Sequence, residues 1–143
     1  MKTWLKVFLG LAVTGIIAAI LVYVFVYNKS HPDYETLKAD FTVTAQQLFD
    51  EFKADNVTAG QKYNGKMVEI SGPLTRMEIS DSLTTAIFVF QQGDFGDEGV
   101  RCSMLPKFTG TAQHLQAGNL VTIKGYCTGF TGDVVMEQCS IRE

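Results

Sequence analysis

Apolar and polar residues alternate through the second half of the chain, in short segments separated by glycine-containing turns. Five such segments are legible, at Lys66–Met77, Thr84–Phe90, Val100–Leu105, Asn119–Cys127 and Asp133–Ile141. Alternation is typical of a half-buried β-strand, because successive side chains of a strand point to opposite faces. One stretch with helical character, Phe108–Gln116, lies between the third and fourth segments. The pattern predicts a mainly β domain with a helix after its third strand.

Five short strands with a helix after the third have the order of an OB-fold, a small Greek-key barrel. Gly72 falls inside the first segment, where the missing side chain allows a strand to bulge or bend. A helix precedes the strands: Thr44 can cap its first turn, and Gln47 completes a capping-box pattern. The stripe that this helix would bury consists of Leu48, Phe49 and Phe52. We therefore predict a five-stranded OB barrel over residues 41–143, with the preceding helix covering one open end.

The N-terminal region is long and apolar. No charged residue occurs from Val7 to Tyr27, a run of 21 residues, against the roughly 20 that a helix needs to cross a bilayer. A cleaved signal peptide has an apolar region of about 7–15 residues and a small-residue cleavage site. We expect instead an uncleaved transmembrane anchor at residues 1–28, in the membrane through residues 7–27, and a linker at residues 29–40.

Charge bears on both topology and ligand. Lys2 and Lys6 precede the apolar run, which favours a cytoplasmic N-terminus and a domain outside the cytoplasm, in the periplasm where an outer membrane exists. The whole chain has a formal charge of -3, and residues 33–143 hold nine basic and all 15 acidic groups, a balance of -6. An acidic domain is repelled by phosphate backbones unless its basic groups cluster.

An ordered series of short motifs resembles the tRNA_anti-like group of OB-fold proteins. The motifs are Tyr63-Asn64-Gly65-Lys66, Ile70-Ser71-Gly72, Val100-Arg101-Cys102-Ser103, Gly118-Asn119-Leu120-Val121-Thr122-Ile123-Lys124-Gly125, Cys127-Thr128-Gly129 and Asp133-Val134-Val135-Met136. This mostly bacterial group often carries an N-terminal membrane anchor or lipoprotein signal. The resemblance covers about Phe41 to Ile141 and implies the OB-fold, but no ligand-contacting residues. This chain lacks a lipidation cysteine, which leaves the apolar helix as its anchor.

The three cysteines are Cys102, Cys127 and Cys139. Export would permit a disulfide, and Cys102–Cys139 is the pairing we expect, because the third and fifth strands of an OB barrel are neighbours. Cys127 is the alternative partner, and three reduced core thiols remain the other interpretation. We predict no metal and no cofactor, because the chain has no C-x-x-C pair and His114 alone could complete a ligand set.

We expect a binding module and no enzyme. No G-x-S-x-G, P-loop or H-E-x-x-H motif occurs. OB-folds bind ligands on the second and third strands and on two of the connecting loops. In this chain that surface would contain Arg76, Phe88, Phe90, Phe95, Arg101, Lys107 and Phe130. Alternating phenylalanines in a small barrel usually belong to the core, which is the stronger interpretation of these residues.

Three functions fit these features. The first is a membrane-tethered, non-catalytic binding module for a protein or envelope component. The second is a binder of single-stranded nucleic acid, in which aromatics stack on bases and cations contact phosphates. The third is an accessory subunit of a membrane complex, since small residues such as Gly10 and Gly15 would allow close helix packing.

Overall fold

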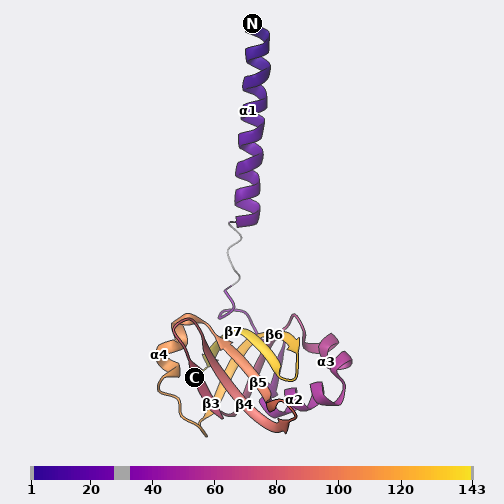
Figure 1. The fold of residues 1–143 in the computed structure, drawn as a ribbon, viewed down its shortest axis with the longest axis vertical. Coiled ribbons are helices and arrows are strands. Elements are labelled where there is room, and N and C mark those ends of the chain that lie inside the picture. The colour runs from indigo at the N-terminus through magenta and orange to yellow at the C-terminus, as the bar shows by residue number, and fades with distance from the viewer. Residues whose placement is uncertain (1, 28–32, 143) are drawn as a thin grey trace. The chain divides into compact units, whose positions relative to one another are not determined.

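The computed structural model describes residues 2–27 and 33–142. The chain divides into two compact units, Met1–Pro32 and Asp33–Glu143. In the first, α1 (Lys2–Val22) continues as a π-helical turn, η1 (Tyr23–Tyr27) (Figure 1). Within the helix Lys2–Tyr27 an 18-residue window has a mean hydropathy of 2.6, so the helix is long and apolar enough to cross a membrane. A signal sequence near an N-terminus meets the same criterion.

The second unit is mainly β, with seven strands in one sheet. Its elements are β1 (Phe41–Thr44), α2 (Ala45–Ala54), α3 (Asn56–Tyr63), β2 (Met67–Pro73), β3 (Arg76–Ile79), β4 (Thr84–Gly93), β5 (Gly96–Met104), η2 (Pro106–Phe108), α4 (Thr109–Ala112), β6 (Leu120–Phe130) and β7 (Val134–Arg142). The strand order is β1-β2-β6-β7-β5-β4-β3. β1 pairs in parallel with β2, and β5 with β7, while the other pairs are antiparallel.

The prediction of five strands in a closed barrel is wrong in strand number and in closure. One additional strand is β1, in a stretch where the sequence indicates only the approach to a helix. The other arises because the first predicted strand is interrupted. Leu74 donates its N–H to the carbonyl oxygen of Asn119 at 2.8 Å, beside β6, whereas Thr75 donates to Ile87 of β4 at 3.0 Å. The chain thus changes pairing partner between two successive residues, and β2 and β3 join different parts of the sheet.

Gly72 does not mark a bulge, because its pairing with Val121 continues the regular register of β2 and β6. A Cβ at Gly72 would lie 3.4 Å from the Cβ of Ala45, the first residue of α2. That distance is an ordinary van der Waals contact, so the packing of α2 on the sheet does not require a glycine at this position.

Helix α2 covers the core as its sequence pattern predicts. Thr44 caps it, accepting the N–H of Gln47 at 3.1 Å, and its apolar stripe is buried. The side chain of Gln47 does not complete a capping box but donates to Glu51 at 3.1 Å. Phe52 stacks on Phe130 of β6 with ring centroids 5.8 Å apart. The predicted helix 108–116 is shorter, consisting of η2 and α4.

Part of the predicted linker belongs to the second unit. Residues 29–32 lie outside the described residues, but Asp33 begins the second compact unit. Asp40 donates its N–H to the carbonyl oxygen of Met67 at 2.7 Å. The segment 33–40 is therefore held against the sheet.

The cysteines are three free thiols, all buried, so the predicted Cys102–Cys139 bridge is absent. Register explains this, because Cys139 lies opposite Met104, two residues beyond Cys102. The register of β5 and β7 also shifts between Cys102 and Met104, so the two cysteines are not a directly opposed pair. Cys127 lies opposite Met136 and forms no bridge either. Burial raises the pKa of Cys127 to about 11 and also raises that of Cys139, which keeps both thiols protonated and unreactive.

Candidate binding site at the β4–β5 hairpin

The β4–β5 hairpin presents an exposed aromatic side chain at its tip. The strands pair as far as Gly93 and Gly96, so that Asp94 and Phe95 form the turn. Gly96 has a φ of +126°, which glycine adopts without steric cost. The sequence, rich in glycine and acids, indicates a long loop from Gln91 to Gly99, because such residues are depleted in strands. Pairing overrides that preference, and the paired hairpin presents Phe95 with 106% relative exposure.

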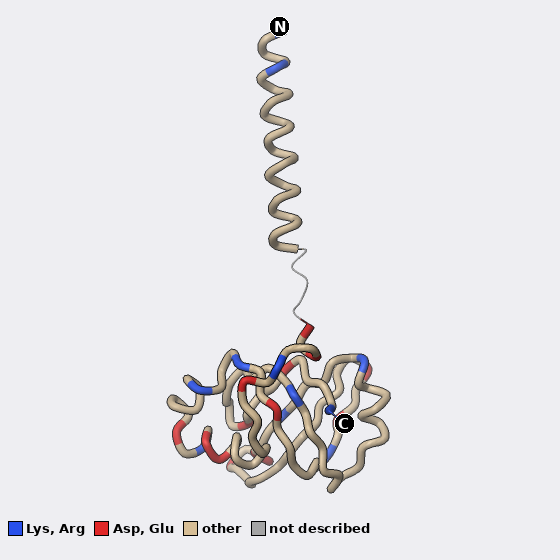
Figure 2. The backbone as a smooth tube through the Cα atoms, turned by 180° about the vertical axis from the view of Figure 1, so that it is seen from behind, with Lys and Arg blue, Asp and Glu red and all other residues tan. Residues whose placement is uncertain are grey.

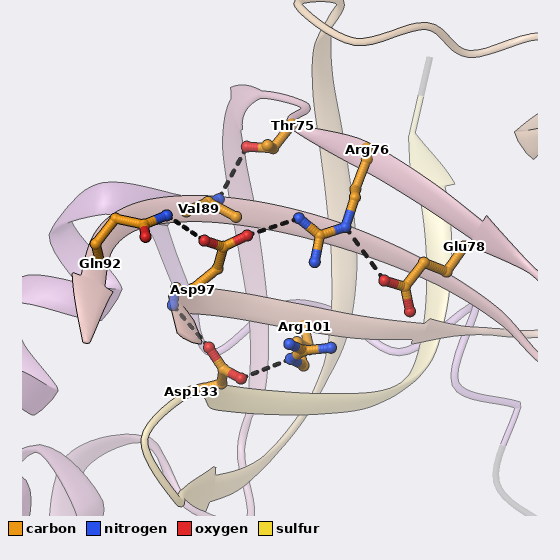
Figure 3. Close-up of polar contacts among 9 residues, drawn as sticks. Thr75, Arg76, Glu78, Val89, Gln92, Asp97, Arg101 and Asp133 are labelled. Carbon is orange, nitrogen blue, oxygen red and sulfur yellow. Dashed lines mark hydrogen bonds and ion pairs between the residues drawn. The ribbon is translucent and has the colours of Figure 1, made fainter. Parts of the chain in front are cut away.

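A cleft of about 370 Å³ lies beside this tip. It is lined by Arg76, Phe95, Gly96, Asp97, Glu98, Arg101, Thr131, Gly132 and Asp133. These residues come from β3, from the hairpin and from the turn between β6 and β7. Figure 3 shows how four of the charged ones lie: Arg76, Asp97, Arg101 and Asp133. Three segments that are distant in sequence thus form one site.

Each arginine of the cleft is paired with carboxylates. Arg76 donates from Nε to Glu78 at 3.2 Å and from its terminal nitrogen to Asp97 at 2.9 Å (Figure 3). The hydrogen bonds to Asp97 and Glu78 raise the pKa of Arg76 further above its ordinary value. Arg101 donates from Nε to Asp133 at 2.5 Å. These contacts hold both guanidinium groups in fixed orientations.

The acids are also bound within the protein. The second carboxylate oxygen of Asp133 accepts the backbone N–H of Gly99 at 2.7 Å, and Asp97 accepts a hydrogen bond from Gln92. Glu98 accepts from Lys53 of α2 at 2.7 Å. The lining contains two arginines and three acids, a formal charge of -1. A phosphate would have to compete with carboxylates for every arginine here.

Charge on the rest of the second unit is mixed. Figure 2 shows acidic and basic positions interspersed along the backbone of this unit, with no continuous basic track in that view. A polyanion that follows a protein surface requires such a track.

Of the seven residues predicted to bind a ligand, Arg76, Phe95 and Arg101 line the cleft together. Phe88 is fully buried, and its selection as a ligand contact is wrong because it lies on the core face of β4. Phe90 and Phe130 pack against phenylalanines of α2. Lys107 lies on η2, where it pairs with Glu35.

Sequence reasoning missed the acidic partners of the arginines. Asp133 precedes β7, and only the parallel register of Val100 with Val134 brings it to Arg101. Asp97 is visible in the sequence as part of an acidic stretch, and its contact with Arg76 depends on the pairing of β3 with β4. No local pattern reports such pairings, so the charge balance of the cleft is a result of the fold.

The fold and cleft together define a small β domain with a polar cleft beside an exposed phenylalanine. The family comparison is more specific: the chain belongs to the tRNA_anti-like family, whose model matches residues 1–141. The resemblance of the motifs is thereby confirmed. Among curated proteins, none matches this sequence.

The fold is similar to that of a candidate nucleic acid-binding lipoprotein from Klebsiella pneumoniae subsp. pneumoniae, seen in a crystal structure. The TM-score is 0.52 and the sequence identity is 14%, with 80% of this chain and 100% of that chain covered. At this identity the likeness concerns the fold alone.

Proposed function

We propose that this protein is a membrane-tethered, non-catalytic OB-type binding module that docks a protein or envelope component in the cleft beside Phe95. The observation that carries the proposal is the combination of a fully exposed phenylalanine with arginines already neutralised by carboxylates. Aromatic residues, phenylalanine among them, are enriched at the cores of protein interfaces, so an exposed ring at the tip of a paired hairpin is a candidate anchor for a protein partner. Neutralised arginines contribute hydrogen bonds and stacking surfaces rather than net positive charge.

The OB-type assignment draws support from the way β2 continues into β3. At Leu74 and Thr75 the chain passes from β6 to β4, so one interrupted strand contacts two distant parts of the sheet. With this strand counted once, the order β2-β6-β7-β5-β4-β3 is what an OB topology requires. β1 then adds to the outer edge of β2.

We further propose that residues 1–28 form an uncleaved anchor and that the β unit lies outside the cytoplasm. The length and apolar character of α1 with η1 support the anchor. Lys2 and Lys6 support a cytoplasmic N-terminus. The similarity in fold to a lipoprotein is in keeping with an envelope location.

The test is co-purification of the full chain from its own membranes in mild detergent. We expect a partner that stays bound to the wild type, is lost from Phe95→Ala and is retained by Leu83→Ala. Leu83 is a suitable control because it is also an exposed apolar residue, at 50% relative exposure, and does not line the cleft. A partner set that is identical for all three proteins would refute docking at Phe95.

Single-stranded nucleic acid is the second candidate ligand. Two observations favour it: Arg76 and Arg101 lie near the aromatic ring of Phe95, and the similar fold belongs to a candidate nucleic acid-binding protein. Fluorescent oligonucleotides titrated at low salt and at about 100 mM salt distinguish the two, because charge-driven affinity falls steeply with salt. Binding that persists at the higher salt and is weakened by Arg101→Gln would support nucleic acid over a protein partner.

A further inference from the structure

The segment 33–40, which we call the strap, joins the apolar helix to the first strand of the sheet. Its first part is a turn, in which the N–H groups of Thr36 and Leu37 donate to the carbonyl oxygen of Asp33 at 3.0 and 3.2 Å. The side chain of Asp33 also accepts the N–H of Glu35 at 3.2 Å. The carbonyl oxygens of Glu35 and Leu37 lie at the end of this turn. No following helical turn supplies a backbone N–H to them, so they can accept a hydrogen bond from a side chain.

That donor is Lys124, a lysine of β6 with only 3% relative exposure. Its ammonium donates to the carbonyl oxygen of Glu35 at 2.6 Å and to that of Leu37. Within the described part of the chain, Lys124 has no carboxylate at salt-bridge distance. Burial lowers its pKa, and the neighbouring Arg142 lowers it further. A buried ammonium must be hydrogen-bonded to be tolerated, so Lys124 and the strap stabilise each other.

The other contacts of the strap are polar or lie near its ends. Glu35 pairs with Lys107 of η2, and Tyr34 meets Tyr126 of β6 edge to face, with centroids 6.3 Å apart. At the far end Asp40 accepts the N–H of Met67 at 2.9 Å. Between these points Leu37 is 40% exposed and Lys38 is exposed. With no fully buried apolar side chain of its own, the strap can separate from the sheet by local opening while the core remains folded.

We propose that the strap is a linker segment that the Lys124 ammonium holds reversibly on the sheet, and that it is released as a unit. Release would detach eight residues, 33–40, from the sheet, so that they could extend between the apolar helix and β1. This adds a reach of at most about 26–29 Å in the extended form. The gain in reach rests on the membrane anchoring proposed above, whereas the attachment of the strap to the sheet does not. The molecule would thereby bind partners at two ranges of distance from its anchor.

Limited trypsin digestion of the full chain in detergent micelles tests this directly, because Lys38 lies inside the strap. We expect cleavage after Lys38 to be about tenfold faster in Lys124→Gln than in the wild type. A tenfold increase corresponds to lowering the free energy of strap opening by about 1.4 kcal/mol. Lys66→Gln, which removes a different and exposed lysine, should digest like the wild type. Equal rates after Lys38 in all three proteins would overturn the proposal.

If Lys124→Gln fails to fold, trypsin will also cut it throughout α2 and α3. Hydrogen exchange of the wild type then tests the proposal without a variant. The amides of Thr36 and Leu37 should exchange faster than the amide of Cys127, which donates to Lys66 at 3.0 Å within the sheet region. Equal protection of these amides would mean that the strap opens only with the whole unit, and the idea of a releasable linker segment would then be wrong. Neither measurement involves the cleft, so their outcome is independent of what Phe95 binds.

Discussion

Two phenylalanines seven positions apart show how strongly the environment of a residue decides its role. Phe88 is fully buried in β4, and Phe95 stands at the tip of the hairpin that β4 forms with β5. From the sequence both were candidates for ligand contact, Phe88 on the second predicted strand and Phe95 in the loop that follows it. Only the packing of α2 and the pairing of β5 separate the core phenylalanine from the exposed one.

The two alanine variants should therefore differ sharply in stability. Phe88→Ala removes a fully buried ring and should lower the free energy of unfolding by about 3–5 kcal/mol. Phe95→Ala removes a ring that contacts nothing in the fold and should change it by less than about 0.5 kcal/mol. Denaturant unfolding of the full chain in detergent, followed by circular dichroism, measures both. Comparable losses in the two variants would mean that Phe95 packs against the protein.

At the scale of secondary structure, one residue, Asp55, both ends α2 and caps the start of α3. Asp55 follows α2 and caps α3, with one carboxylate oxygen accepting the N–H groups of Val57 and Thr58, each at 3.1 Å. The other accepts the hydroxyl of Thr58 at 2.6 Å. The hydrogen bond from the Thr58 side chain, followed by those from the backbone, lowers the pKa of Asp55 below its ordinary value.

A carboxyl whose pKa is lower in the folded protein stabilises the fold above its unfolded pKa of about 3.9, and this stabilisation is lost as the pH falls through the folded value. Asp55→Asn keeps an N-capping side chain without a titrating group. The difference in melting temperature, wild type minus Asp55→Asn, should therefore be larger at pH 7 than at pH 3. Thermal unfolding at both pH values gives this double difference, in which the other titrating groups largely cancel. A difference that does not change with pH would exclude Asp55 as a charged cap.

What could be predicted at this scale was local. The cap at Thr44 and the buried face of α2 follow from spacing alone, because a helix repeats every 3.6 residues. The interruption at Leu74 and Thr75, the existence of β1 and the extension of the hairpin to Gly93 and Gly96 do not. Each depends on which strand lies alongside, and a single sequence carries no record of that pairing. The cleft has the same origin, since Arg76 and Arg101 were visible but their carboxylates were not.

On the scale of the whole molecule, a lipid-compatible helix and an acidic β unit occur in one chain. Residues 33–143 carry a formal charge of -6, which works against adsorption to anionic lipid or nucleic acid through charge alone. The binding proposed for this unit would then come from particular contacts such as those at Phe95. The proposed anchor would favour such binding, because tethering raises the effective concentration of the unit near partners in the same membrane.

This division of roles requires that the anchor stay attached. The helix Lys2–Tyr27 exceeds the 7–15 apolar residues of a signal peptide, and Lys2 and Lys6 should hold its start in the cytoplasm. The protein isolated from membranes should therefore have an intact mass that includes residues 1–27, and should remain in the membrane after an alkaline carbonate wash. Protease added to spheroplasts should digest the β unit, while a cytoplasmic control protein stays intact. A mature chain that begins after Tyr27, or a β unit protected in intact spheroplasts, would leave Phe95 without a tethered role, and partners would then have to be sought in solution or in the cytoplasm.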